Sequence, residues 1–211
     1  MKRILDVTIS FTALILLSPL FFLIALALIC VAGSPVLFRQ ERPGFKGRPF
    51  TIFKFRTMHQ AETRVESPMS DEIRLHRLGR FLRSSSLDEL PELWNVLCGD
   101  MSLVGPRPLL MKYLPLYNAK QNRRHEVRPG ITGWAQIHGR NAVSWEERFD
   151  LDIWYVDHRS LWLDLKILCI TFLKVLSREG ISAEGHSTIP EFPGNMKQSR
   201  PDEEIQENKD N

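Results

Sequence analysis

The sequence predicts an α-rich α+β fold with an N-terminal re-entrant membrane hairpin (helix, break, helix), a small β-hairpin, and a helical body with interfacial amphipathic helices. Three observations predict this fold. Residues 4–32 are almost entirely apolar but are interrupted at Ser18-Pro19. Residues 36–41 and 50–55 are short β-prone runs joined by a turn-rich segment. Most of the segments that follow, up to residue 176, have helical patterns.

The apolar run is long enough to cross a membrane only if it is straight. A helix over residues 4–32 would be roughly 43 Å long, whereas the hydrocarbon core is about 30 Å thick. Pro19 lacks an N–H and clashes with the preceding turn, so we expect a sharp kink there, with the Ser18 hydroxyl bonded to a freed carbonyl. Each arm is then only about 20 Å long, which is too short to span.

Basic residues flank both ends of this run. Lys2 and Arg3 precede it, and four more basic residues follow it between positions 39 and 48. Excess Lys and Arg mark the cytoplasmic side of a membrane, so residues 1–34 are predicted to enter and return on the inner leaflet. A kinked helix that spans the membrane remains the alternative. A signal peptide is disfavoured because its apolar region is typically shorter.

Composition divides the rest of the chain into two parts. Residues 190–211 contain six acids and three bases and have no apolar period, so they are predicted to be an acidic disordered tail. The remainder of the 211 residues carries 25 bases and 19 acids, which suits an anionic leaflet, anionic substrates or nucleic acid. The three cysteines form no C-x-x-C pair, which argues against a disulfide framework or a zinc site.

A cytoplasmic domain, which includes the β-hairpin and the helical body, is predicted to occupy residues 35–189, after the membrane segment. Residues 59–72 are polar and are expected to form a mobile loop. The segment 161–176 is strongly apolar and is either a core helix or an interfacial helix on the membrane. The other expected helices cover residues 73–83, 88–97, 109–124 and 145–158.

The most reactive-looking stretch runs from Ser86 to Pro91. Because Pro is tolerated in the first helical turn, Asp88 is expected close to an N-cap, where the helix dipole keeps it ionised. It can then serve as a nucleophile or a metal ligand. Glu89 can act as an acid or base if its surroundings raise its pKa. Simple capping, with Ser86 and Glu89 as a capping box, is the alternative.

Four basic residues are candidates for binding an anion. Arg107 lies between two prolines that fix its backbone, as an anion clamp requires. Arg83 and Arg140 can grip phosphate oxygens through two N–H groups each. Lys54 lies within an aromatic strand. Taken one at a time, such residues are more often ordinary surface charge.

These motifs together carry a resemblance to a known family. From about residue 1 to 190, the chain resembles the bacterial sugar transferase family, and among its members the small monotopic phosphoglycosyl transferases of the undecaprenyl phosphate N,N'-diacetylbacillosamine 1-phosphate transferase type. The matching segments are Phe38–Gly44, Lys54–Met58, Arg83–Pro91, Gly99–Ser102, Gly105–Pro108, Arg128–Gly133 and Gly139–Asn141.

The resemblance implies an Mg²⁺-dependent transferase on the cytoplasmic face of the bacterial inner membrane. It would move a sugar 1-phosphate from a UDP-sugar to undecaprenyl phosphate, release UMP, and start the synthesis of a surface glycan or glycoprotein oligosaccharide. Asp88 would be the nucleophile and a metal ligand, and Glu89 would assist the lipid phosphate. The implied substrate-binding residues are Lys54, Arg83, Arg107 and Arg140.

Several alternatives remain open from the sequence. Residues 139–142 and 177–180 look more like those of family members that use an N-acetylated amino sugar as the donor, whereas UDP-glucose or UDP-galactose would use the same chemistry. A membrane-tethered scaffold without catalysis is an alternative of a different class. The apolar hairpin disfavours nucleic acid as a partner. A homodimer is left open.

Overall fold

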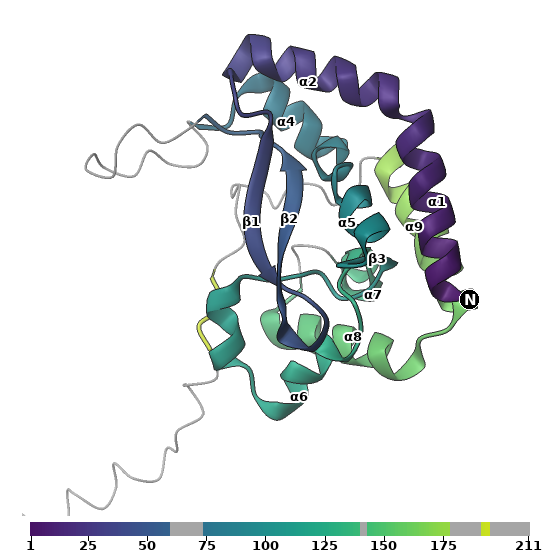
Figure 1. The fold of residues 1–211 in the computed structure, drawn as a ribbon. Coiled ribbons are helices and arrows are strands. Elements are labelled where there is room, and N and C mark those ends of the chain that lie inside the picture. The colour runs from purple at the N-terminus through teal and green to yellow at the C-terminus, as the bar shows by residue number, and fades with distance from the viewer. Residues whose placement is uncertain (60–73, 140–142, 178–190, 195–211) are drawn as a thin grey trace, which may run out of the picture.

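The computed structural model describes residues 1–59, 74–139, 143–177 and 191–194. Helices dominate, and the strands form two two-stranded sheets, which confirms the predicted α-rich α+β class (Figure 1). The helices are α1 (Lys2–Leu16), α2 (Ser18–Ala32), α4 (Arg77–Ser84), α5 (Glu92–Cys98), α6 (Ala119–Asn122), α7 (Trp134–His138), α8 (Trp145–His158) and α9 (Leu161–Ser177). The strands are β1 (Leu37–Pro43), β2 (Pro49–Phe55), β3 (Ser102–Val104) and β4 (Gly130–Thr132).

The N-terminal helices α1 and α2 meet at the predicted break and are bent by 60°. Because Pro19 has no N–H, the Ile15 carbonyl loses the donor it would have in a continuous helix. The Ser18 hydroxyl donates to this carbonyl instead, at 2.8 Å. Within the described residues no single helix is long and apolar enough to cross a membrane, whereas α1 and α2 together meet that test across their bend.

The first turns of α1 are fastened to the body by three charged residues, Lys2, Arg3 and Asp6, which we call the anchor latch. Lys2 Nζ lies 2.6 Å from Asp164 Oδ2 on α9. Arg3 donates to two carbonyls near the end of α5. Asp6 is buried and accepts from the Ser102 hydroxyl at 2.8 Å. The two basic residues counted above as flanking membrane charge are therefore bound within the protein.

The other end of the helix pair is fastened as well. Arg56, which directly follows β2, donates to the carbonyls of Ala32 and Gly33 at the end of α2. The apolar face of α2 packs through Ile24 and Leu28 against residues of β2 and α4. Figure 1 shows α2 crossing above α4 and the end of the β-hairpin, while α1 descends beside α9. Both ends of the bent pair are thus fixed to one body.

The predicted β-hairpin is confirmed. Strands β1 and β2 pair antiparallel from Leu37↔Phe55 to Pro43↔Pro49. Asn95 of α5 joins this hairpin to the helical body, since its amide donates to the Thr51 carbonyl and accepts from the Phe53 N–H. The second sheet, a short parallel pair of β3 and β4, lies inside the main apolar core.

Helix α9 has one face in the core and another face that is apolar and exposed. Ile167 is fully buried and Asp164 is 3% exposed, so one face belongs to the core. Trp162, Phe172 and Leu173 are each more than 60% exposed, so another face offers large apolar side chains to the surroundings. This exposed face is the kind of surface that lies on a lipid interface.

Two expected helices are interrupted in the structure. Instead of one helix over residues 109–124, there are a 3₁₀ helix (Met111–Leu116) that contains Pro115, then α6, and then a second 3₁₀ helix (Arg123–Glu126). Asn118 forms a capping box with Gln121 and starts α6 anew. The helix predicted over 88–97 starts only at Glu92. The expected loop 59–72 lies almost entirely outside the described residues.

Part of the segment predicted to be a disordered tail packs on the body. Phe192 is buried, and its ring lies 5.1 Å from that of Phe149 and 5.8 Å from that of Tyr113. The backbone N–H of Phe192 donates to the Tyr113 hydroxyl. Residues 195–211 lie outside the described residues.

Candidate active site

The Asp88-Glu89 pair lies on a single 3₁₀ turn, Leu87–Glu89, between α4 and α5. Helix α4 ends at Ser84, and Ser86 adopts a left-handed conformation (φ 56°) that redirects the chain. The N-cap position predicted for Asp88 is wrong, because α5 begins at Glu92 with Pro91 before it. The capping box is also absent, since the Ser86 side chain makes no capping hydrogen bond.

Asp88 is only 9% exposed. Burial raises its pKa to about 6, and the negative charge of Glu89 adds to the rise. Lys54, Arg107 and Arg83 oppose it through their charges. Its surroundings therefore raise the pKa of Asp88, where a helix dipole alone would lower it, and a pKa of about 6 leaves the carboxylate largely ionised at pH 7.

Glu89 has the opposite environment. Its carboxylate accepts from Lys54 Nζ at 2.5 Å and is gripped by both terminal nitrogens of Arg107. Burial alone would raise the pKa of Glu89, but the charges and hydrogen bonds of Arg107 and Lys54 outweigh burial and hold this pKa well below its ordinary value. A carboxylate with so low a pKa is a weak proton acceptor, and it binds neighbouring cations strongly.

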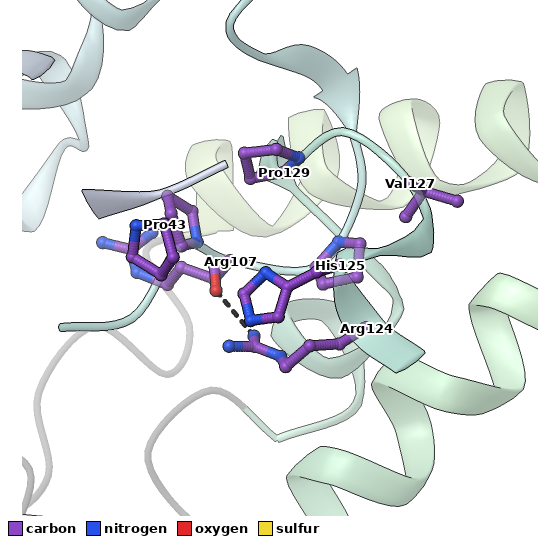
Figure 2. A pocket seen from close by; sticks show the side chains of 8 residues that line it. Pro43, Arg107, Arg124, His125, Val127 and Pro129 are labelled. Carbon is purple, nitrogen blue, oxygen red and sulfur yellow. Dashed lines mark hydrogen bonds between the residues drawn. The ribbon is translucent and has the colours of Figure 1, made fainter. Parts of the chain in front are cut away.

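The backbone of Arg107 is held by hydrogen bonds from other arginines as well as by its two flanking prolines. Arg124 Nη2 donates to the Arg107 carbonyl at 2.7 Å, as Figure 2 shows, and pairs with Asp152 at the same distance. Arg124 and Asp152 are both about 2% exposed, so this pair is fully buried. Arg42 supports the turn from the other side by donating to the Pro108 carbonyl. Sequence reasoning missed Arg124 and Asp152 as supports of the site.

A small hollow lies against the Pro-Arg-Pro turn (Figure 2). Burial, with the positive charge of Arg124, lowers the pKa of His125 to about 4, so its ring is neutral at physiological pH. The hollow is therefore lined by rigid proline rings and by a neutral imidazole beside two arginines. Its lining residues are Pro43, Pro106, Arg107, Pro108, Arg124, His125, Val127 and Pro129.

The structure brings most of the predicted site residues together. Lys54 and Arg107 meet at Glu89, on the turn that carries Asp88. Arg83 donates to the Thr57 hydroxyl at 3.0 Å and acts on Asp88 through its charge. Arg140 lies outside the described residues.

Glu92 is a further site residue that the sequence reasoning missed. It is 1% exposed, and its Oε1 lies 3.0 Å from Lys54 Nζ. Burial raises the pKa of Glu92 to about 7, against the attraction of Lys54. A usable sequence signal existed, because residues three apart share one face of a helical turn and Glu92 follows Glu89 at that spacing.

The donor set fits a magnesium ion that is bound mainly through substrate. Among the described residues, no three or more His, Cys, Asp or Glu side chains converge as metal ligands. Mg²⁺ is commonly held by one or two carboxylates together with substrate phosphates. Asp88 can supply one such carboxylate, because no cation of the described segments lies at hydrogen-bond distance from it, whereas Lys54 and Arg107 both bind Glu89.

A pair of adjacent carboxylates beside several cations suits phosphoryl transfer, which depends on positioning and on the stabilisation of charge. The chain belongs to the bacterial sugar transferase family, whose model matches residues 1–178. It is 55% identical over 194 residues to the uncharacterized sugar transferase EpsL of Bacillus subtilis, covering 92% of this chain and 96% of the relative.

Two longer relatives have named substrates. The chain is 42% identical over 183 residues to the UDP-glucose:undecaprenyl-phosphate glucose-1-phosphate transferase of Klebsiella pneumoniae, covering 82% of this chain and 39% of the relative. It is 38% identical over 193 residues to the galactosyl transferase CpsE of Streptococcus agalactiae, covering 85% of this chain and 43% of the relative. The chain thus spans about two fifths of the length of these two relatives.

Proposed function

We propose that this protein transfers a sugar 1-phosphate from a UDP-sugar to undecaprenyl phosphate and releases UMP. The observation that carries the proposal is the contrast within one turn: Asp88 is a buried, poorly stabilised carboxylate, and Glu89 beside it holds two cations. The names of the longer relatives support the same chemistry.

In the first half-reaction, an Asp88 carboxylate oxygen attacks the β-phosphorus of the sugar nucleotide. A bond forms between this oxygen and phosphorus while the bond from phosphorus to the bridging oxygen breaks, and UMP leaves with that electron pair. The sugar phosphate remains on Asp88 as an acyl phosphate. Lys54 and Arg107 stabilise the charge of the diphosphate as the bond breaks.

In the second half-reaction, an oxygen of undecaprenyl phosphate attacks the same phosphorus, and the bond to Asp88 breaks. We propose that Glu89 acts here mainly by keeping Lys54 and Arg107 in place for the incoming phosphate. The role predicted from the family, in which Glu89 assists the attack of the lipid phosphate, then works through these two cations, because its low pKa makes it a weak proton acceptor.

Magnesium is part of this proposal. When bound, Mg²⁺ would neutralise charge on the diphosphate of the sugar nucleotide. Asp88 would be its protein ligand. Arg83 and Arg140 are proposed to add positive charge at the edge of the site, as the sequence motifs imply.

The proposed donor is UDP-glucose or UDP-galactose. The sequence alone favoured an N-acetylated amino sugar, but the relatives with named substrates are glucose or galactose transferases. We therefore propose a neutral hexose donor and treat an amino-sugar donor as the competing outcome of the test.

We propose that the bent helix pair is re-entrant and holds the site at the cytoplasmic face of the inner membrane. The support is that the anchor latch fixes the start of α1 and Arg56 fixes the end of α2 to the same body. A helix pair that left its two ends on opposite sides of the bilayer would break one of these attachments. Accessibility of either end to a periplasmic thiol reagent, tested with single cysteines, would contradict this orientation.

The decisive experiment measures UMP release by purified full-length protein with undecaprenyl phosphate, Mg²⁺ and a panel of UDP-sugars. We expect turnover with UDP-glucose or UDP-galactose and loss of turnover in Asp88→Asn. A non-catalytic scaffold would give no UMP with any donor. Preference for a UDP-N-acetyl amino sugar would overturn the donor but keep the reaction.

A further inference from the structure

Glu92 is buried more completely than either member of the Asp88-Glu89 pair. It is 1% exposed and lies in the first turn of α5, three residues after Glu89. A buried carboxylate is unfavourable unless it is paired, and replacing a buried ion pair with apolar residues is often neutral or stabilising. Stability alone therefore does not account for a glutamate at this position.

Its partner is Lys54, which reaches the site from strand β2. Lys54 Nζ lies 3.0 Å from Glu92 Oε1 and 2.5 Å from Glu89 Oε1, so the ammonium group is shared between two carboxylates. Only the contact with Glu89 has the geometry of a hydrogen bond, and Glu92 Oε1 is buried without one in the described part of the chain. In its ionised form, Glu92 thus acts on Lys54 by charge.

The two elements that carry this contact are held in register by Asn95. Its side chain, three residues after Glu92, bonds to the backbone of β2 on either side of Ile52. Helix α5 therefore fixes the strand backbone with Asn95 and the Lys54 side chain with Glu92. A lysine side chain has a long flexible stem, so a fixed backbone alone would leave its ammonium group free to move.

We infer that Glu92 is a positioning residue that holds the Lys54 ammonium beside Glu89, ready for the diphosphate of the sugar nucleotide. Glu89 is already occupied by Arg107, and without Glu92 the Lys54 side chain has one carboxylate contact in place of two. An ammonium group has three N–H donors, so Lys54 can keep both carboxylates and still donate to a phosphate oxygen. This inference rests on the proposed function, because it needs a diphosphate substrate.

The test is a double-mutant cycle on the full-length protein, with UDP binding by calorimetry and UMP release as readouts. Glu92→Met removes the carboxylate at similar volume, and Glu92→Gln keeps an acceptor oxygen without its charge. We expect Glu92→Met to weaken UDP binding about tenfold, with Glu92→Gln between it and the wild type. In UMP release, KM for the UDP-sugar rises more than kcat falls, because Lys54 contacts the substrate before the reaction.

The decisive comparison is made in the background of Lys54→Met. There, Glu92→Met should change UDP binding less than about twofold, since no ammonium group remains to be positioned. Equal effects of Glu92→Met in both backgrounds, or wild-type binding in Glu92→Met alone, would overturn the positioning role. Binding is measurable even where Lys54→Met abolishes turnover.

Two controls distinguish positioning of Lys54 from a general change in surface charge and from misfolding. Glu126→Gln alters an exposed ion pair with Arg123 and should leave UDP binding unchanged. The melting temperature of Glu92→Met should not fall, because burial disfavours the charged form of Glu92 more than Lys54 favours it, and Lys54 keeps Glu89 as a partner. A wild-type protein that neither binds UDP nor releases UMP counts against the proposed function, whereas an active wild type with an indifferent Glu92→Met counts against this inference alone.

Discussion

Two clusters of charge are built in opposite ways. In the anchor latch, Lys2 meets Asp164, Arg3 meets backbone carbonyls, and Asp6 meets a hydroxyl and a backbone N–H. In the site, the carboxylates of Asp88, Glu89 and Glu92 share the two cations Lys54 and Arg107. The site therefore has more carboxylates than close cations, while each latch charge has its own partner.

The difference teaches which cluster serves stability and which serves chemistry. Burial raises the pKa of Asp88 to about 6 and that of Glu92 to about 7, so the folded site favours protons on two of its acids. Carboxylates whose charged form is disfavoured by burial destabilise the folded protein, and they are common at sites where a reactive group must be kept available. Mutations in the latch should therefore reduce stability, and mutations in the site should reduce activity.

The largest expected effect is on turnover, from Asp88→Asn. We expect UMP release to fall at least about 10³-fold, as for loss of a catalytic nucleophile. The free energy of unfolding should rise in the same variant. The pKa of Asp88 is raised from 3.8 to about 6, so its stabilising contribution is complete below about pH 4 and is lost as the pH rises through 6.

Chemical denaturation at pH 7.5, without Mg²⁺, measures this gain in stability, which we expect to be about 1–3 kcal/mol. The matched control is Glu89→Gln, the neighbouring acid whose pKa is lowered. It should decrease stability, because Lys54 and Arg107 lose a shared partner. Stability changes of the same sign in the two variants would contradict the contrast between these carboxylates.

The next largest effect is on stability, from breaking the anchor latch. Asp164→Asn leaves Lys2 without its carboxylate, and we expect a loss of about 2–3 kcal/mol, the lower end for such pairs because Lys2 is partly exposed. The double variant Lys2→Met with Asp164→Leu should recover much of the lost stability. Thermal unfolding in detergent measures the stability of the two variants, and their kcat per folded molecule should stay unchanged. A large fall in kcat with normal folding would show that the latch also serves the reaction.

A smaller effect is expected from pH. With Asp88 as the nucleophile and its pKa at about 6, kcat/KM should fall about tenfold per pH unit below that value. The profile of kcat/KM from pH 4.5 to 8 checks this expectation. The control variant Glu126→Gln, at an exposed residue, should leave unchanged the pH below which kcat/KM falls. A flat profile across this range would exclude Asp88 as the titrating nucleophile.

Sequence patterns predicted the elements that depend on local chemistry. The break at Ser18-Pro19 follows from a missing N–H, and the β-hairpin follows from two short β-prone runs joined by a turn-rich segment; both are present. The motifs also singled out Asp88, Glu89, Lys54 and Arg107, and the structure brings these four residues into one cluster.

The electrostatics of the site could not be predicted in this way. The pKa values of Asp88 and Glu89 move in opposite directions, although the two residues are adjacent, because Lys54 and Arg107 approach one of them from distant segments. The supports Arg124 and Asp152 lie 28 residues apart and carry no motif. Burial and long-range pairing, rather than residue type, decide these properties.

The smallest expected effect comes from the break itself. Ser18→Ala removes the hydrogen bond to the Ile15 carbonyl, which should cost about 1 kcal/mol, while Pro19 keeps the helices apart. Replacing both residues with leucine restores a continuous helix pattern, so the pair should straighten and UMP release should fall further than in Ser18→Ala. Cysteine accessibility on the two sides of the membrane reports the topology. Full activity of the double variant with unchanged topology would show that the attachments of α1 and α2 to the body set the bend without help from the break.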